Sequence, residues 1–425
     1  MQPSSTTAAP RSPSFNYVLT DGIPFALVHL ACFAAIWTGV HWTDLTLFIA
    51  LYALRMFGIT AGYHRYFAHR SYKTSRPFAF LLALIAQSSA QRGVLWWAAN
   101  HRRHHRFSDT ERDVHSPVRH GFWHSHFGWF FTAEQDRTDI DAVPDLARFP
   151  ELRWLDRHPY MPAIVLGFVV WLAAGWSGLV VGFLWSTVAL WHATFSINSV
   201  AHVLGRRRYL TADASRNNWW LALLTFGEGW HNNHHHFESA ARQGFRWYEF
   251  DLSYYVLKAL AAPGLVWDLR HPPKAVVRSE QRLRRAVVEH AAGQLAGSFH
   301  IEQIAAELHA MLAEKRASLN ASVAELQAAL AGLLDAWSRQ LDERLEMARH
   351  DLDELVGTVH LPAMPTVAEL RARASAMFVV TPSMNDIVER GRQILIENVL
   401  AEMFGQRAMV QANTRRNSSA ARTRH

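Results

Sequence analysis

The sequence predicts an all-α membrane protein with four transmembrane helices, a cytosolic histidine-rich helical cap and a C-terminal helical extension. Half of its 425 residues are hydrophobic, and the apolar residues gather in the first part of the chain, whereas the charged residues gather in the last. Several of the 17 tryptophans stand at the ends of apolar stretches, where an amphipathic ring suits a membrane interface. The net charge of +7 comes mostly from arginine, as is typical of the cytoplasmic rim of a membrane protein.

Composition divides the chain into four predicted parts. Residues 1–20 are rich in Ser, Thr, Ala and Pro and lack a compact apolar core with a cleavage site, so we expect a disordered leader and no signal peptide. Residues 21–273 form the predicted membrane domain. Residues 274–410 carry apolar residues at helical spacing and predict a helical extension that serves interactions. Residues 411–425 are predicted to be a basic disordered tail.

Four apolar stretches in the membrane domain approach the length of about 20 residues that a helix needs to cross a bilayer. Very short links, around His41–Asp44 and near Ser177–Gly178, force the stretches into two helical hairpins. A weaker run, Phe78–Ala90, is short for a span, and we expect it at the interface or against the site. The four stretches are Ile23–Trp42, Leu45–Gly62, Met161–Trp176 and Leu179–Ser196.

Charge predicts the orientation of these spans. Arginine is dense between His64 and His158 and again after Ala201, whereas the two hairpin links carry no Lys or Arg. The positive-inside rule therefore places both termini and the histidine-rich segments in the cytoplasm. The Ala- and Arg-rich composition and the extra tail suggest a bacterial source, so we expect a multi-pass protein of a bacterial inner membrane.

Histidine spacing is the most informative feature of the sequence, which contains 25 His. Two clusters have the form His-x-x-His-His, in which residues i, i+3 and i+4 share an arc of about 100° on a helix. An Asn-x-x-x-His pair also shares a helical face, whereas a His-x-x-x-x-His pair spans about 140°, so that its members would reach two metals or the helix would end between them. The candidate metal ligands are His64, His69, His101, His104, His105, Asn198, His202, His231, His234 and His235.

Nine histidines and one asparagine are enough for two metal ions with four or five ligands each. A single buried histidine is more often a satisfied core residue than a ligand, but that interpretation does not explain four such groups at one predicted membrane face. Imidazole suits Fe, Zn, Cu and Ni, and ligand type alone does not choose among them. The single cysteine, Cys32, excludes both a disulfide within the chain and a thiolate metal site.

Further residues near the clusters are candidates for supporting roles. Metal-bound histidine usually donates its other N–H to a carboxylate or carbonyl, so Asp109, Asp113 and Glu228 are candidates for that contact, although acidic residues in such loops are often only solvated. Counting back by fours from His64 places three side chains on one face of the second span, and we expect them to close a substrate tunnel, although ordinary span packing would also explain them. These three residues are Thr60, Met56 and Tyr52.

At these clusters the sequence resembles the membrane fatty-acid desaturases, most closely those of the stearoyl-CoA (delta-9) type, over about residues 20–270. The resemblance rests on Gly58–Gly62 running into the first cluster, on Ser125-His-Phe-Gly-Trp129, and on Gly227-Glu-Gly-Trp running into the third cluster. It implies a four-span fold with a cytosolic cap and two irons held by the nine histidines, with Asn198 acting through water. Trp97, Asn100 and Trp129, which lie in or beside these motifs, are expected to contact the substrate.

The implied reaction is O2-dependent insertion of a cis double bond into a saturated acyl chain, most simply at the delta-9 position of an acyl-CoA. Ala99 and Asn100 replace an Arg-Asp pair, and Ala133 and Glu134 an Arg-Lys pair, that animal members associate with the CoA group. A phospholipid-bound acyl chain is therefore the alternative substrate. No haem motif of the His-Pro-Gly-Gly type is visible, so we expect a separate electron donor (ferredoxin, rubredoxin or cytochrome b5) with its reductase.

Two rival functions remain open. A membrane di-iron hydroxylase of alkanes or sterols uses similar histidine clusters, and it would yield an alcohol in place of an alkene. A metal-handling membrane protein would need polar residues along its spans, but these are largely apolar, with Arg55 as the one basic residue inside them. Zinc is able to replace iron in such ligands when the protein is overproduced. Nothing in the sequence points to nucleic-acid binding.

Overall fold

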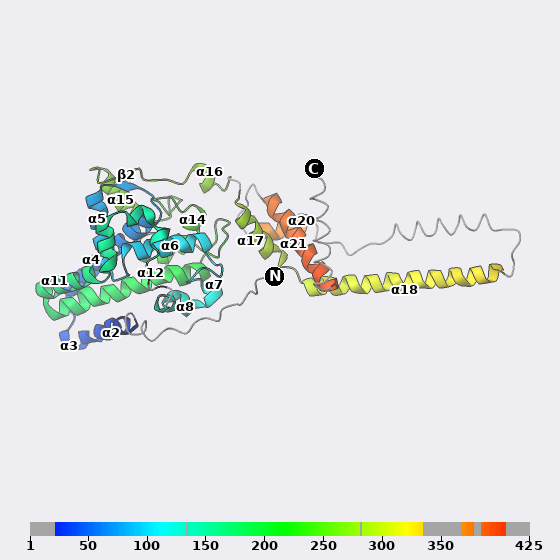
Figure 1. Cartoon of the computed structure of the whole chain (residues 1–425), viewed down its shortest axis with the longest axis horizontal. Helices are drawn as coiled ribbons and strands as arrows, with labels where there is room; N and C mark the ends of the chain where they lie inside the picture. Colours follow the sequence, from blue (N-terminus) through cyan, green and yellow to red (C-terminus); the bar gives the residue numbers. More distant parts are fainter. Residues whose placement is uncertain are drawn as a thin grey trace. The chain divides into compact units, whose positions relative to one another are not determined.

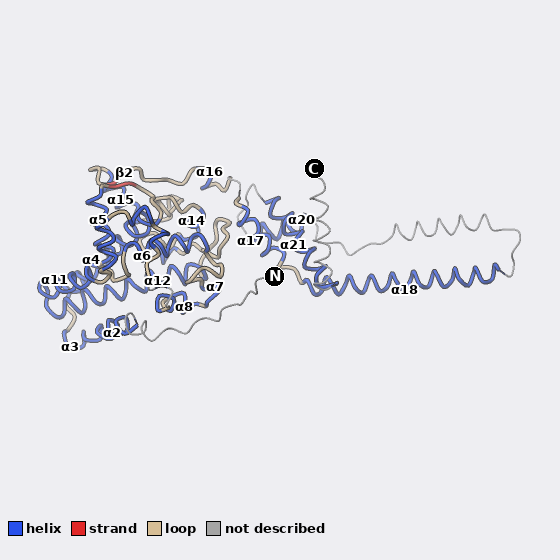
Figure 2. Tube along the Cα trace, viewed as in Figure 1, coloured by secondary structure: helices blue, strands red, loops and turns tan. Residues whose placement is uncertain are grey.

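A computed structural model describes residues 22–132, 135, 137–280, 283–334, 367–377 and 384–404 of the chain. The fold is almost entirely helical in these ranges, as Figure 2 shows. The chain divides into two compact units, residues 1–281 and 282–425. The predicted leader, the basic tail, Ala133 and Glu134 lie outside the described residues.

Two described helices are long and apolar enough to cross a membrane, Trp42–Ala68 and Met161–Val203. The apolar helices Ile23–Thr38 and Arg76–Gln87 are shorter. Inside Met161–Val203 the chain leaves helical geometry at Gly175, which has a φ of +65°, and the segment before it packs against the segment after it. The second hairpin therefore turns at Gly175, a little before the predicted link, because glycine accepts a positive φ without steric cost.

The second apolar segment begins as an α-helix, α4 (Trp42–Phe57), and continues as a π-helix, η3 (Gly58–Ala68). The Asp44 carboxylate accepts a hydrogen bond from the backbone N–H of His41, which satisfies a donor at the start of α4. η3 packs against α5 (Arg76–Gln87), and a Cβ at Gly58 would lie 2.7 Å from the backbone nitrogen of Ala86. Glycine at this position therefore permits the close approach of the two helices.

The first unit is completed by helices and loops that follow the apolar segments (Figure 1). α6 carries the second histidine cluster and packs against η3, and α12 carries Asn198 and His202 and packs against α4 and α8. A two-stranded antiparallel sheet pairs Lys73 with Trp267. The elements are α2 (Ile23–Ala31), η2 (Cys32–Ala34), α3 (Ala35–Thr38), β1 (Lys73–Thr74), α6 (Val94–Phe107), α7 (Pro117–His120), α8 (Phe122–His126), η4 (Gly128–Phe131), η6 (Ile140–Ala142), α9 (Pro144–Ala147), α10 (Pro150–Arg157), α11 (Met161–Ser177), η7 (Gly178–Trp185), α12 (Ser186–Val203), α13 (Trp219–Leu224), α14 (His231–His236), α15 (Leu252–Ala261), β2 (Val266–Trp267) and α16 (Lys274–Val277).

The boundary between the units lies slightly later than the sequence interpretation placed it. α16 falls within the first unit, where the buried side chain of Val276 packs with Tyr209 and Phe245. The second unit contains α17 (Arg285–Ala296), α18 (Ile301–Leu334), α20 (Val367–Met377) and α21 (Met384–Phe404). Leu308 and Leu395 lie in its core, as expected for amphipathic helices that bury one face.

Candidate metal centre

Nine histidines converge from four elements of the first unit. His64 lies in the π-helix η3 and His69 directly follows it, α6 carries three histidines, α12 carries His202, and α14 carries three. Each ring offers one nitrogen to one of two groups, whose ligand atoms lie within 4.8 Å of one another. The first group is His64, His69, His101, His105 and His234, and the second is His104, His202, His231 and His235.

The adjacent histidines of each His-x-x-His-His cluster separate between the two groups. His104 and His105 are neighbours in the chain, yet they belong to different groups, as do His234 and His235. Consecutive residues of a helix point about 100° apart, so each cluster supplies ligands to two ions. The two groups are therefore built from the same helices.

For His64 and His69 the sequence left two alternatives, that they reach two metals or that the helix ends between them, and the structure has the second, because η3 ends at Ala68. Both belong to the first group, and their ring centroids lie 4.8 Å apart. The helix is a π-helix here, and the backbone N–H of His69 donates to the carbonyl of His64 at 3.1 Å. Because residues i and i+5 face each other in π geometry, the pair shares one site.

The spacing of the ring nitrogens tests whether a metal ion fits the first group. Two ligand atoms each about 2.1 Å from one ion lie about 3.0 Å apart at right angles, and about 3.4 Å apart at the tetrahedral angle. The Nε2–Nε2 distances are 3.0 Å for His64–His234, 2.8 Å for His69–His101, 3.0 Å for His101–His105 and 2.9 Å for His105–His234. Five ligands at such spacing fit one ion with right-angled bonds and exceed the four positions of a tetrahedral ion.

The second group also has the donor set that a metal ion requires. The Nε2 atoms of His202 and His231 lie 3.1 Å apart, close to the right-angle spacing. The Nε2 atom of His235 is buried and has no hydrogen-bond partner, although buried polar atoms normally have one. A metal ion would satisfy this atom, so the residues of the second group fit an ion as well.

Buried carboxylates hold three of the four histidines of the second group by their other ring nitrogen. Asp109 contacts His202 Nδ1 at 3.1 Å, and Asp113 contacts His104 Nδ1 at 3.1 Å. A hydrogen bond from Nδ1–H to a carboxylate fixes the tautomer that presents the Nε2 lone pair to a metal. Both aspartates were expected in this role from the sequence.

Asp213 completes this set, and sequence reasoning missed it. Its Oδ2 lies 2.8 Å from His235 Nδ1, and its Oδ1 accepts from the backbone N–H of Ser215 at 3.0 Å. Burial alone would raise the pKa of the Asp213 carboxyl, but the facing His235 holds that pKa well below its usual range. Asp213 is therefore an anionic acceptor for His235 at neutral pH.

In the first group, Glu228 contacts His64 Nδ1, as the sequence suggested, and Glu238, which the sequence interpretation missed, lies 3.2 Å from His105 Nδ1. Glu228 is buried and is itself held by Arg65, whose guanidinium lies 3.0 Å from Glu228 and 2.9 Å from Asp251. Glu238 is 45% exposed, so solvent weakens its influence. The buried support of the first group therefore comes mainly from Glu228.

An apolar cavity of about 770 Å³ adjoins the histidines, within the range of about 300–1,000 Å³ that small-molecule sites occupy. His101 and Asn198 line its inner part, as do three of the expected substrate-binding residues, Trp97, Asn100 and Trp129. Asn198 lies four residues before His202 on α12, and with His101 it is one of two expected ligands in the cavity lining. The cavity therefore offers room for a long apolar molecule beside the histidine groups.

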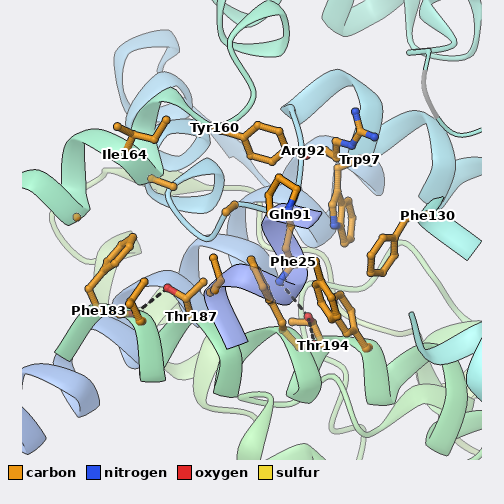
Figure 3. Close-up of a pocket in the computed structure, with 18 of the residues that line it drawn as sticks. Phe25, Gln91, Arg92, Trp97, Phe130, Tyr160, Ile164, Phe183, Thr187 and Thr194 are labelled. Atoms are coloured by element: carbon orange, nitrogen blue, oxygen red, sulfur yellow. Dashed lines mark hydrogen bonds between the residues drawn. The ribbon is translucent and has the colours of Figure 1, made fainter. Parts of the chain in front are cut away.

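Two polar residues that the sequence did not single out lie in the cavity wall. Gln91 Nε2 donates to Thr194 Oγ1 at 2.9 Å, and Figure 3 shows this bond between the loop before α6 and helix α12. The loop has positive φ values at Ala90 and Arg92, which non-glycine residues rarely adopt. Buried hydrogen bonds hold it, including one from Trp191 Nε1 to Ser89 O at 2.8 Å.

Tyr52, Met56 and Thr60, expected to close the tunnel, lie outside the lining of this cavity. Met56 is fully buried in the main hydrophobic core, and Thr60 Oγ1 contacts Ser253 Oγ at 2.5 Å. The Tyr52 hydroxyl donates to Leu224 O at 2.7 Å. The expectation assumed α-helical geometry back from His64, whereas the π-helix turns the face of α4 away from the line of that histidine.

Comparison with known proteins places these features in a family. The sequence profile described as "fatty acid desaturase" matches residues 40–270. The chain is 37% identical over 266 residues to an acyl-CoA 5-desaturase of Anemone leveillei, which covers 61% of this chain and 79% of that protein. It is 36% identical over 268 residues to an sn-1 stearoyl-lipid 9-desaturase of Anabaena variabilis, in an alignment that covers 62% of this chain and 97% of that protein. It is 38% identical over 250 residues to the delta-9 acyl-lipid desaturase 2 of Arabidopsis thaliana, in an alignment that covers 58% of this chain and 80% of that protein.

Proposed function

The chain belongs to the fatty acid desaturase family and is an oxidoreductase, and from that premise we propose that it inserts a cis double bond, at the delta-9 position, into a saturated acyl chain. The reaction consumes O2, two electrons and two protons and releases two molecules of water. The observation that carries this proposal is the apolar cavity that extends from His101 and Asn198 beside two histidine groups. A methylene chain lying there would pass beside the metal site where His101 and Asn198 line the cavity.

Two irons are the ions proposed for these groups. Bound there, redox iron supplies the O2 chemistry that removes hydrogen from an unactivated methylene, which no amino-acid side chain does alone. The nine histidines would hold the ions, Asp109, Asp113, Asp213 and Glu228 would orient the rings, and Asn198 would act through water. Trp97 and Trp129 confine the acyl chain, so that bound geometry selects the carbon that reacts.

Acyl-CoA is the carrier expected from the sequence, but one observation favours a lipid-linked acyl chain. The cavity is lined in part by apolar side chains of α11 that are also exposed, including Ile164 and Phe168, which are 69% and 56% exposed. Such side chains would face lipid if α11 crosses a membrane, so a chain could enter sideways from the bilayer. Among the described residues of the lining, Arg92 is the one Lys or Arg, so the lining carries little positive charge for the phosphates of CoA.

The proposed location is a membrane crossed four times, with both termini and the histidines on the cytoplasmic side of a bacterial inner membrane. The two long apolar helices and the two shorter ones support this arrangement. The electrons come from a separate donor of the ferredoxin, rubredoxin or cytochrome b5 class, with its reductase. Donor and topology are both accessible to direct experiment.

The test is expression in a host that lacks its own desaturase, followed by gas chromatography with mass spectrometry of total fatty acids, beside a His104→Ala control. New monounsaturated chains absent from the control would support the proposal and give the double-bond position. Hydroxylated chains would show that the enzyme is a hydroxylase and would refute the proposed desaturase activity. No new product from protein that carries two irons and a supplied donor would refute the proposal for these substrates. Separating phospholipids from acyl-CoA before the analysis identifies the carrier.

A further inference from the structure

Arg55 is a fully buried cation within the candidate span Trp42–Ala68. Charged residues inside apolar spans are costly and usually serve a function. Among the described residues, no carboxylate forms an ion pair with Arg55. Its guanidinium donates instead to neutral oxygens, namely Leu51 O, Ser88 O, Thr187 Oγ1, Phe183 O and Ser186 Oγ.

Two of the five partners of Arg55 belong to the wall of the acyl cavity. Arg55 Nη1 donates to Thr187 Oγ1 at 2.7 Å, and both Thr187 and Phe183 line the cavity (Figure 3). The guanidinium carbon also lies 5.0 Å from the centroid of the Phe183 ring, within cation–π range. On its other side the ring leaves little room, because a Cβ at Gly167 would lie 3.0 Å from it. Phe183 is therefore wedged between Arg55 and α11.

This part of the wall lies far from the metal site. Thr187 and Asn198 are both on α12, and a helix rises about 1.5 Å per residue, so they are separated by about 16 Å along the helix axis. The lining around Phe183 includes Leu179, Leu184 and Gly167, which offer no charge or amide to a polar carrier. The chemistry of this region suits the methyl end of an acyl chain whose reacting carbons lie beside Asn198.

We propose that Arg55 is a positioning residue that fixes the methyl-end wall of the cavity, through Thr187 and Phe183, and thereby limits the length of acyl chain that the enzyme accepts. The proposal rests on the function proposed above. Five donors directed at five neutral oxygens restrain this wall more tightly than packing alone, because each bond lost would leave a buried polar group unpaired. We therefore expect the cavity to accept longer acyl chains when Arg55 or Thr187 is substituted.

The experiment compares Thr187→Val, Arg55→Met and Arg55→Lys with the wild-type chain in a desaturase-deficient host supplied with saturated fatty acids of graded length. Thr187→Val keeps the shape of the side chain and removes the hydroxyl that accepts from Arg55 and donates to Phe183 O, so it remains informative if Arg55→Met fails to fold. Leu54→Ala is the matched control, because Leu54 precedes Arg55 on α4, is 46% exposed and lies outside the cavity lining.

We expect Thr187→Val to raise the ratio of long to short unsaturated products by about tenfold, the scale on which a methylene group in an apolar pocket changes specificity. The metal content and the double-bond position, counted from the carboxyl carbon, should stay unchanged because the histidines are untouched. Arg55→Lys should keep part of the wild-type ratio, and combining Arg55→Met with Thr187→Val should add little to Arg55→Met alone.

A wild-type ratio of chain lengths in metal-loaded, active Thr187→Val protein would overturn the proposal, as would the same shift in Leu54→Ala. Independent, additive shifts in the double variant would overturn it too, because they would show that Thr187 acts without Arg55. Failure of the proposed function is distinguishable, since the wild-type chain would then yield no alkene at any chain length.

Discussion

Replacing Asp213 by asparagine should weaken metal binding at the second histidine group. The two oxygens of Asp213 accept from different donors, His235 Nδ1 at 2.8 Å and the backbone N–H of Ser215 at 3.0 Å. Asparagine has one carbonyl oxygen and one NH2 group, so one of these donors would face another donor. Loss of such a contact behind a metal-bound histidine typically costs about 10–100-fold in metal affinity, or about 1.4–2.7 kcal/mol.

The assay is the metal-to-protein ratio of purified Asp213→Asn and wild-type protein after dialysis against graded concentrations of a chelator. We expect the variant to lose about half of its metal, that of the second group, at a chelator concentration about 10–100-fold lower than the wild type requires. The control is Glu151→Gln, which makes the same chemical change in a pair with Arg76, whose side chain is 60% exposed. Equal metal retention by folded Asp213→Asn and wild-type protein would refute the role of Asp213.

Three further predictions concern stability and domain organisation. Arg65→Met should lower the free energy of unfolding by about 3–5 kcal/mol, because it leaves two buried carboxylates without their cation, and thermal unfolding in detergent measures it. Gly58→Ala should destabilise the chain by about 1–3 kcal/mol in the same assay, because the methyl group would lie 2.7 Å from Ala86 N. Deletion of residues 282–425 should leave metal content and product unchanged, since the first unit contains both histidine groups and the cavity; loss of either would contradict this.

The histidines that form the two groups could be predicted from sequence because their spacing is a local property of helices. Residues at i, i+3 and i+4 share a face whatever the rest of the fold does, so the clusters at His101 and His231 indicated a metal site directly. Their division between two groups was less accessible. It depends on which side of each helix faces its neighbour, and the π-helix that ends at Ala68 brings His64 and His69 into one group.

The supporting carboxylates were predictable only where they stand close to a cluster in the chain. Asp113 lies nine residues after His104, whereas Asp213 lies 22 residues before His235. Glu238 stands three residues after His235, yet it contacts His105, which lies 133 residues earlier in the chain. Loops, which carry no periodic pattern, bring these residues together. A carboxylate in such a loop is indistinguishable in sequence from a solvated one, and only its burial against an imidazole reveals its role.

The residues of α4 that the sequence analysis selected do not line the cavity, because the π-helix changes the direction in which they face. The sequence of α4 nevertheless contained another indication of the cavity. Arg55 stands next to Met56, and a cation in an apolar span requires a compensating partner. Three of the partners are hydroxyl and carbonyl oxygens of residues 128–132 positions later in the chain, which no spacing rule connects to Arg55. The charged residue in the apolar span was visible in the sequence, whereas its hydrogen-bond partners at the cavity wall could be found only from the structure. A buried charge that has no counter-ion nearby in the sequence marks a functional position more reliably than helical periodicity does. Arg55 is therefore a stronger candidate than Met56 for control of chain length.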